Sequence, residues 1–173
     1  TPCQSSAASD VYKRQYLLVN HLSNQISKDI KLGDRCVLIS ENRPEWMISD
    51  LAIMLAGGIS VPSYTTYTTK DYEYIIKDCE PSVLIVSNNT QFNKIKDILD
   101  YKKIKKIISF DRLENLKFQN YLCIEDIINK KDGFENFDSE ISLKRSDPAC
   151  IIYTSGTQGN PKGVILSHGG TVS

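Results

Sequence analysis

The sequence predicts an α/β fold in which a mainly parallel sheet is flanked by helices. Short apolar runs of strand length recur at 36–39, 83–86 and 149–153, and such runs are typical of parallel strands buried on both faces. Between them lie segments whose apolar residues recur at helical spacing. Strands that alternate with helices of this kind indicate right-handed βαβ crossovers and therefore a mainly parallel sheet.

The first predicted element is a helix over 16–30, with apolar residues at helical spacing. Gly33 is expected to stop this helix, and the strand at 36–39 follows. Pro44 and Glu45 then predict the start of a second helix, because proline fits the first helical turn and an acidic side chain favours the positive end of the helix dipole. This second helix is apolar nearly all round, which predicts deep burial.

Glycines and a capping motif mark the next elements. Gly57 and Gly58 are expected to end the second helix, because glycine permits the left-handed cap, and a brief strand follows at 59–61. Thr68 and Asp71 have the spacing of a capping box, in which each side chain satisfies a free backbone N–H group. They predict a third helix, whose expected inner face consists of Tyr72, Ile75, Ile76 and Cys79.

The second half of the chain continues the alternation. After the strand at 83–86, a helix is expected to bury Phe92, Ile95, Ile98 and Leu99. A strand is expected at 107–108. The pattern weakens between 111 and 146, where a helix is expected at 125–130, and strands are expected at 149–153 and 164–166.

Composition excludes several function classes. The 21 Lys and Arg residues balance 21 Asp and Glu residues, whereas a protein that binds nucleic acid by neutralising phosphates usually has a basic surplus. The longest apolar run, at 51–61, is too short to cross a bilayer. Five scattered cysteines without a C-x-x-C pair make no zinc spacing and are expected to be buried thiols of a cytoplasmic protein.

Two residue clusters invite functional interpretations that we consider weaker than structural ones. Lysines surround a predicted strand start and are expected to protect a solvated sheet edge rather than to bind an anionic surface. A group of tyrosines is expected to make ordinary packing contacts rather than to stack on bases. The lysines are Lys102, Lys103, Lys105 and Lys106, and the tyrosines are Tyr64, Tyr67, Tyr72 and Tyr74.

The two ends of the chain differ from its middle. Residues 1–15 are polar and rich in small side chains, and we expect a tail outside the fold, either translated adaptor sequence or a disordered extension. The chain begins at Thr1 without a methionine and stops at Ser173, shortly after a glycine-rich motif. Residues 16–173 are therefore expected to form an incomplete N-terminal domain of a longer protein.

The motif that carries chemistry is YTSGTQGNPKGV, at 153–164 between the last two predicted strands. Its glycines let backbone N–H groups approach phosphate oxygens closely, and its hydroxyls add hydrogen-bond donors. Lys162 supplies a movable positive charge, and Pro161 stiffens the chain before it. These features predict a polyphosphate-binding loop, with a simple polar turn as the alternative. The loop differs from that of the P-loop nucleoside triphosphatases, because Pro161 stands where their spacing requires glycine.

This motif resembles the phosphate-binding signature of the adenylate-forming, AMP-dependent synthetase and ligase superfamily, [ST]-S-G-[ST]-[ST]-G-x-P-K-G. Only Gln158 departs from it. The matching residues are Thr154, Ser155, Gly156, Thr157, Gly159, Pro161, Lys162 and Gly163. The stretches at 33–35, 40–46, 50–52 and 61–62 are similar to the long-chain acyl-CoA synthetase branch.

The resemblance implies a fatty acid–CoA ligase whose N-terminal, AMP-binding domain includes residues 16–173. In this reaction a fatty-acid carboxylate attacks the α-phosphate of Mg-ATP, and the thiol of coenzyme A then displaces AMP from the acyl-adenylate. The implied substrates are fatty acid, ATP and CoA, with Mg²⁺ as cofactor. No nucleic-acid partner is expected, and contact with a membrane surface and the oligomeric state stay open.

The resemblance also assigns roles to residues. The ATP phosphates would be bound by Thr154, Ser155, Gly156, Thr157, Gln158, Gly159 and Lys162. The hydroxyl of Thr157 would lie near Mg²⁺, and the amide of Gln158 can donate where the family has a hydroxyl. His168 is expected to be structural, and no catalytic residue is expected within these 173 residues.

We therefore expect the chain alone to be inactive and to expose apolar strand faces. Two alternatives stay open. One is another adenylate-forming enzyme, either a fatty acyl-AMP ligase or the adenylation domain of a peptide synthetase. The other is a non-catalytic nucleotide-binding module.

Overall fold

The computed structural model describes residues 3–129, 141–154 and 161–171. The described strands form one sheet, in the order β5-β4-β3-β1-β2-β6-β7. They are β1 (Arg35–Ile39), β2 (Ile59–Ser63), β3 (Val83–Val86), β4 (Lys106–Ser109), β5 (Tyr121–Cys123), β6 (Pro148–Thr154) and β7 (Lys162–Ser167). The helices are α1 (Cys3–Ser27), α2 (Pro44–Leu55), α3 (Thr69–Cys79), α4 (Asn89–Ile95), α5 (Ile124–Asn129) and α6 (His168–Thr171).

The predicted mainly parallel sheet is confirmed. Every neighbouring pair from β5 to β6 is parallel, and β6 and β7 form an antiparallel hairpin. The hairpin follows from the short connection at 155–161, because a parallel pair needs a crossover of about a dozen residues or more. The sequence pattern did not predict β5, which has only three residues.

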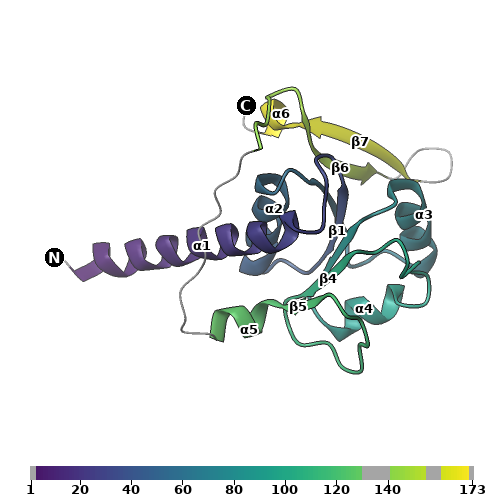
Figure 1. The fold of residues 1–173 in the computed structure, drawn as a ribbon, viewed down its shortest axis with the longest axis horizontal. Coiled ribbons are helices and arrows are strands. Elements are labelled where there is room, and N and C mark those ends of the chain that lie inside the picture. The colour runs from purple at the N-terminus through teal and green to yellow at the C-terminus, as the bar shows by residue number, and fades with distance from the viewer. Residues whose placement is uncertain (1–2, 130–140, 155–160, 172–173) are drawn as a thin grey trace.

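Helices cover both faces of the sheet (Figure 1). Alternate side chains of each central strand enter different cores, as the pleat requires. Leu38 of β1 and Ile85 of β3 pack with α1, α2 and α5, whereas Val37 and Leu84 pack with α3 and α4. This double burial explains why these strands are continuous apolar runs in the sequence.

Helix α1 begins earlier than expected. The structure describes a continuous helix from Cys3, so the segment expected to be a tail is helical from that residue on. Its side chains at 12–16 are exposed, and burial begins at Leu18. In Figure 1 this end of α1 extends away from the sheet. That residues 1–15 are foreign to the natural protein stays a prediction.

Helix α2 is buried on one face only, so the expectation of deep burial all round is wrong. Ile48, Ala52 and Ile53 enter the core, but Met47 is 62% and Leu51 is 48% exposed. The buried face packs against α1 and the sheet. Within the described part of the chain, the opposite face of α2 stays open to solvent.

The interpretation of the lysine cluster as a protected sheet edge is wrong. Strand β4 lies inside the sheet, because β5 pairs with its outer side. The Lys106 side chain is buried and forms an ion pair with Asp29, with Nζ and carboxylate oxygen 2.7 Å apart. Lys103 and Lys105 form ion pairs with Glu80 and Asp34. Three of the four lysines therefore join elements within the fold.

Local predictions for α3 are confirmed in detail. The Thr68 hydroxyl accepts a hydrogen bond from the backbone N–H of Asp71, and the Asp71 carboxylate accepts one from the backbone N–H of Thr68. Tyr72, Ile75 and Cys79 are buried, and Ile76 is half-buried. Helix α4 ends at Ile95, so Ile98 and Leu99 lie beyond it.

The cysteine prediction holds for the thiols that the structure describes. Cys36, Cys79, Cys123 and Cys150 are free and buried. Burial raises the pKa of Cys79 to about 12, so this thiol stays protonated at neutral pH. None of the described helices has the length and apolarity needed to cross a membrane.

Candidate functional site

The predicted phosphate-binding loop connects β6 to β7. Its central residues, Ser155, Gly156, Thr157, Gln158 and Gly159, lie outside the described residues. The described ends are Thr154, the last residue of β6, and Lys162, the first residue of β7. These two residues are paired across the hairpin, and both are exposed. The fold thus places Thr154 and Lys162 opposite each other at the base of the loop.

The loop begins at the carboxyl end of β6, and ligands of α/β proteins usually bind near the carboxyl ends of the strands. Strand β6 runs parallel to β2, with Ser60 aligned to Cys150, so the carboxyl ends of both strands point to the same edge. Ligands of open α/β sheets bind outside the carboxyl ends of the strands. A cleft of about 480 Å³ opens at this edge, between residues that follow β1 and β2 and Ile152 of β6.

Gly163 is fixed by packing. It lies opposite Tyr153 in the hairpin. A Cβ atom at Gly163 would be 3.0 Å from Cγ2 of Ile151 and 3.3 Å from two ring carbons of Tyr153. The last glycine of the signature therefore lets β7 lie close to the aromatic ring that precedes the loop.

Tyr153 is held through both its main chain and its side chain. Its hydroxyl donates a hydrogen bond to Oδ2 of Asp78 at 2.5 Å, and its carbonyl accepts one from the hydroxyl of Tyr67 at 3.0 Å. Burial, together with the bond to Asp78, raises the pKa of Tyr153 above its usual value. From the sequence, Tyr67 is expected only to pack. No motif marks its contact with β6, which links residues 86 positions apart in the chain.

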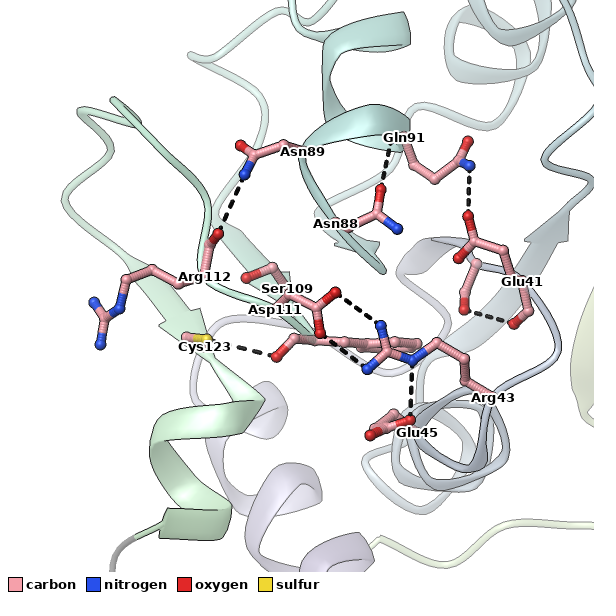
Figure 2. Close-up of polar contacts among 12 residues, drawn as sticks. Glu41, Arg43, Glu45, Asn88, Asn89, Gln91, Ser109, Asp111, Arg112 and Cys123 are labelled. Carbon is pink, nitrogen blue, oxygen red and sulfur yellow. Dashed lines mark hydrogen bonds and ion pairs between the residues drawn. The ribbon is translucent and has the colours of Figure 1, made fainter.

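A second polar cluster lies at the carboxyl ends of β1, β3 and β4 (Figure 2). Arg43 donates two hydrogen bonds of 2.9 Å to Asp111 and a third, of 3.3 Å, to Glu45. The bonds to Asp111 raise the pKa of Arg43 above its usual value. Gln91 donates to Glu41 at 2.7 Å. The pairs Arg43–Asp111 and Gln91–Glu41 link residues that follow different strands, so we interpret the cluster as a brace for these strand ends.

That brace gives a structural role to part of the stretch at 40–46, which is otherwise notable only for its resemblance to the acyl-CoA synthetase branch. Arg43 precedes α2, and its guanidinium carbon Cζ lies 5.4 Å from the centroid of the Phe110 ring. Asp111 is the residue that follows Phe110 in the chain. The partners lie 68 residues apart, and no local pattern joins them. The sequence therefore drew attention to Arg43 but not to its partner Asp111.

The described residues offer no alternative metal centre. Within 3–129, 141–154 and 161–171, no group of three or more His, Cys, Asp or Glu side chains could hold a metal ion. Thr157, the residue assigned to Mg²⁺, lies outside these ranges. His168 begins α6 and is half-buried, and its backbone N–H binds the carbonyl of Asp147 at 3.0 Å.

Comparison with known proteins decides the family. The family model described as AMP-binding enzyme matches residues 9–173. The chain belongs to the AMP-binding enzyme family. The sequence-based prediction of an adenylate-forming synthetase or ligase is thereby confirmed, although the roles of individual loop residues stay predictions.

Curated relatives of this family member include long-chain-fatty-acid–CoA ligases. The chain is 30% identical over 162 residues to ACSBG1 of Rattus norvegicus, covering 91% of this chain and 22% of the relative. It is 36% identical over 135 residues to ACSBG2 of Xenopus laevis, covering 76% and 18%. The chain thus spans about a fifth of the length of these relatives.

Solved structures confirm the fold of the family member. The anthranilate CoA ligase AuaEII, in complex with anthranoyl-AMP, is similar with a TM-score of 0.73 and 25% identity, covering 91% of this chain and 29% of that one. Coronafacic acid ligase from Pectobacterium brasiliense is similar in fold, with a TM-score of 0.72 and 22% identity over 89% and 29%.

Proposed function

We propose that the protein containing this chain is a long-chain fatty acid–CoA ligase and that this chain supplies its phosphate-binding loop. The observation that supports this most strongly is the signature between β6 and β7, in a chain whose curated relatives carry this ligase name. The reaction would consume a fatty acid, ATP and CoA. It would yield acyl-CoA, AMP and pyrophosphate through an acyl-adenylate.

In this proposal the loop grips the β- and γ-phosphates. Thr154 and Lys162 stand opposite each other at its base, so a hydroxyl donor and a positive charge face the same anion. Backbone N–H groups at Gly156 and Gly159, the hydroxyls of Ser155 and Thr157 and the amide of Gln158 would complete the cradle. Since both reactants are anionic, the main task of these groups is to hold ATP in line and to neutralise its charge.

Magnesium belongs to the proposal through the hydroxyl of Thr157. When bound, the ion would offset the negative charge of the phosphates and favour displacement of pyrophosphate. The fatty acid and CoA would bind to parts of the protein outside this chain. The buried free thiols fit a reducing, cytoplasmic location, and a fatty-acid substrate would bring the enzyme to a lipid surface.

The test is an assay of the protein encoded by the complete reading frame that contains this chain. We expect ATP–pyrophosphate exchange that depends on palmitate, followed by CoA-dependent release of AMP. Exchange that depends on an amino acid would identify a peptide-synthetase adenylation domain instead. Exchange without CoA-dependent turnover would identify a fatty acyl-AMP ligase, and ATP binding without exchange would identify a non-catalytic module.

A further inference from the structure

We propose that Tyr67 is a positioning residue for the phosphate-binding loop and that it acts through the main chain of Tyr153. The inference rests on the proposed function, in which residues 154–162 bind the phosphates of ATP. Tyr67 lies on the connection between β2 and α3, and its contact is with β6.

The contact lies where β6 leads into the loop. Sheet pairing between β2 and β6 aligns Ser60 with Cys150, three residues before Tyr153. At Tyr153 itself, the backbone carbonyl accepts a hydrogen bond of 3.0 Å from the hydroxyl of Tyr67. A backbone carbonyl needs a hydrogen-bond partner when it is buried, and here a side chain supplies that partner from the neighbouring connection. The next residue along the chain is Thr154, at the base of the loop.

The side chain of Tyr67 is held in place by contacts with residues of its own connection and of α3. Its ring makes edge contacts with the rings of Tyr64 and Tyr72, at centroid distances of 5.4 and 5.9 Å. The hydroxyl of Tyr72 donates to the carbonyl of Tyr64 at 2.7 Å, and Nζ of Lys94 donates to the carbonyl of Thr65 at 2.5 Å. A side chain fixed by its own neighbours can fix another group precisely.

Tyr153 transmits this position to both ends of the loop. It is bonded directly to Thr154, and its ring lies against Gly163, where a Cβ atom would be only 3.3 Å from two ring carbons. The bond from its hydroxyl to Asp78 holds the far end of the ring. A shift of Tyr153 would therefore displace Thr154 and Lys162 together. Small displacements of binding groups weaken a preorganised site.

The test replaces one hydroxyl and keeps the ring. In Tyr67→Phe, we expect affinity for inorganic tripolyphosphate, measured by calorimetry on the protein encoded by the complete reading frame, to fall roughly three- to tenfold, the effect of one hydrogen bond. Tyr101→Phe is the matched control, because its hydroxyl also donates to a backbone carbonyl at 3.0 Å, that of Lys96, on a connection remote from β6. We expect this control to bind tripolyphosphate like the unaltered protein.

A double-mutant cycle separates positioning from stability. If Tyr67 acts through the loop, Tyr67→Phe will cost less affinity when Lys162→Ala is already present, because both changes act on one binding unit. If Tyr67 merely stabilises the fold, the two losses will add and the positioning role is overturned. Equal affinity of Tyr67→Phe and the unaltered protein, or equal losses in Tyr67→Phe and Tyr101→Phe, would overturn it as well.

The proposed function has its own distinct failure. If the unaltered protein encoded by the complete reading frame binds no tripolyphosphate, the assignment of the loop falls, and the role of Tyr67 falls with it. If the unaltered protein binds and only the Tyr67→Phe effect is missing, the loop assignment stands and the positioning role alone is overturned.

Discussion

Among the signature residues that the structure describes, Gly163 has little room for a side chain. A methyl group there would press on Ile151 and on the ring of Tyr153. We predict that Gly163→Ala lowers the free energy of unfolding in urea by about 1–3 kcal/mol, the usual effect of overpacking. Gly170→Ala is the control, since its Cβ would meet Ser167 Oγ at an ordinary 3.6 Å. Equal stability of the two variants would refute the packing role of Gly163.

The carboxylate of Asp34 makes the stability of the chain depend on pH. Burial raises its pKa, but hydrogen bonds from Lys105, from the backbone of Lys31 and from Ser82 outweigh burial, so the net pKa of Asp34 is lowered. A depressed carboxyl pKa stabilises the fold above its unfolded value of about 3.9, and this stability is lost as pH falls through the lower folded value.

We therefore predict that the unaltered chain loses more unfolding free energy than Asp34→Asn does between about pH 5 and about pH 3. Urea titrations of both proteins at several pH values measure the difference. Parallel pH curves for the two proteins would show that the pKa of Asp34 is not lowered in the fold.

The capping box makes α3 the element whose start depends most clearly on local sequence. Thr68→Ala removes the hydroxyl that binds the backbone N–H of Asp71. We predict a loss of about 1 kcal/mol in urea unfolding. Thr69→Ala, one residue into the helix, is the control and should stay within about 0.5 kcal/mol of the unaltered chain. A Thr68→Ala variant as stable as this control would contradict the role of the cap.

Elements set by local chemistry were predictable, and those set by distant contacts were not. The run at 83–86 and the start of α2 at Pro44 follow from burial and from the geometry of proline. Strand β5 has three residues, and its pairing with β4 is a long-range choice. For the same reason, the prediction that Lys106 protects a sheet edge was wrong, because only the pairing of β5 with β4 shows that β4 is not an edge strand.

The candidate site divides in the same way. The loop at 154–162 was recognised because glycine, hydroxyl and lysine spacing is a local property of the sequence. Tyr67 and Asp111 were missed as partners because each contacts a residue far away in the chain, Tyr153 and Arg43 respectively. Contacts of this kind depend on strand order, and a single sequence does not reveal it.

For the whole molecule, the length of the chain relative to its family leads to a prediction. The chain covers 22% of the length of a curated relative, and part of β7 is open, with Val164 46% and Ile165 63% exposed. We predict that this chain alone forms no acyl-adenylate, because in the proposed function the fatty acid binds to parts of the protein outside this chain. A hydroxamate assay with palmitate and Mg-ATP measures this, and turnover above background would contradict it.

The central claim is that residues 154–162 bind the triphosphate of ATP. The most direct measurement compares Mg-ATP affinity in the protein encoded by the complete reading frame before and after the double change Gly156→Val and Lys162→Ala. We predict a loss of roughly tenfold or more, since a hydrogen bond to a charged group contributes about 1.5–3 kcal/mol, with palmitate activation falling in parallel. Undiminished ATP affinity and acyl activation in the doubly changed protein would contradict the claim.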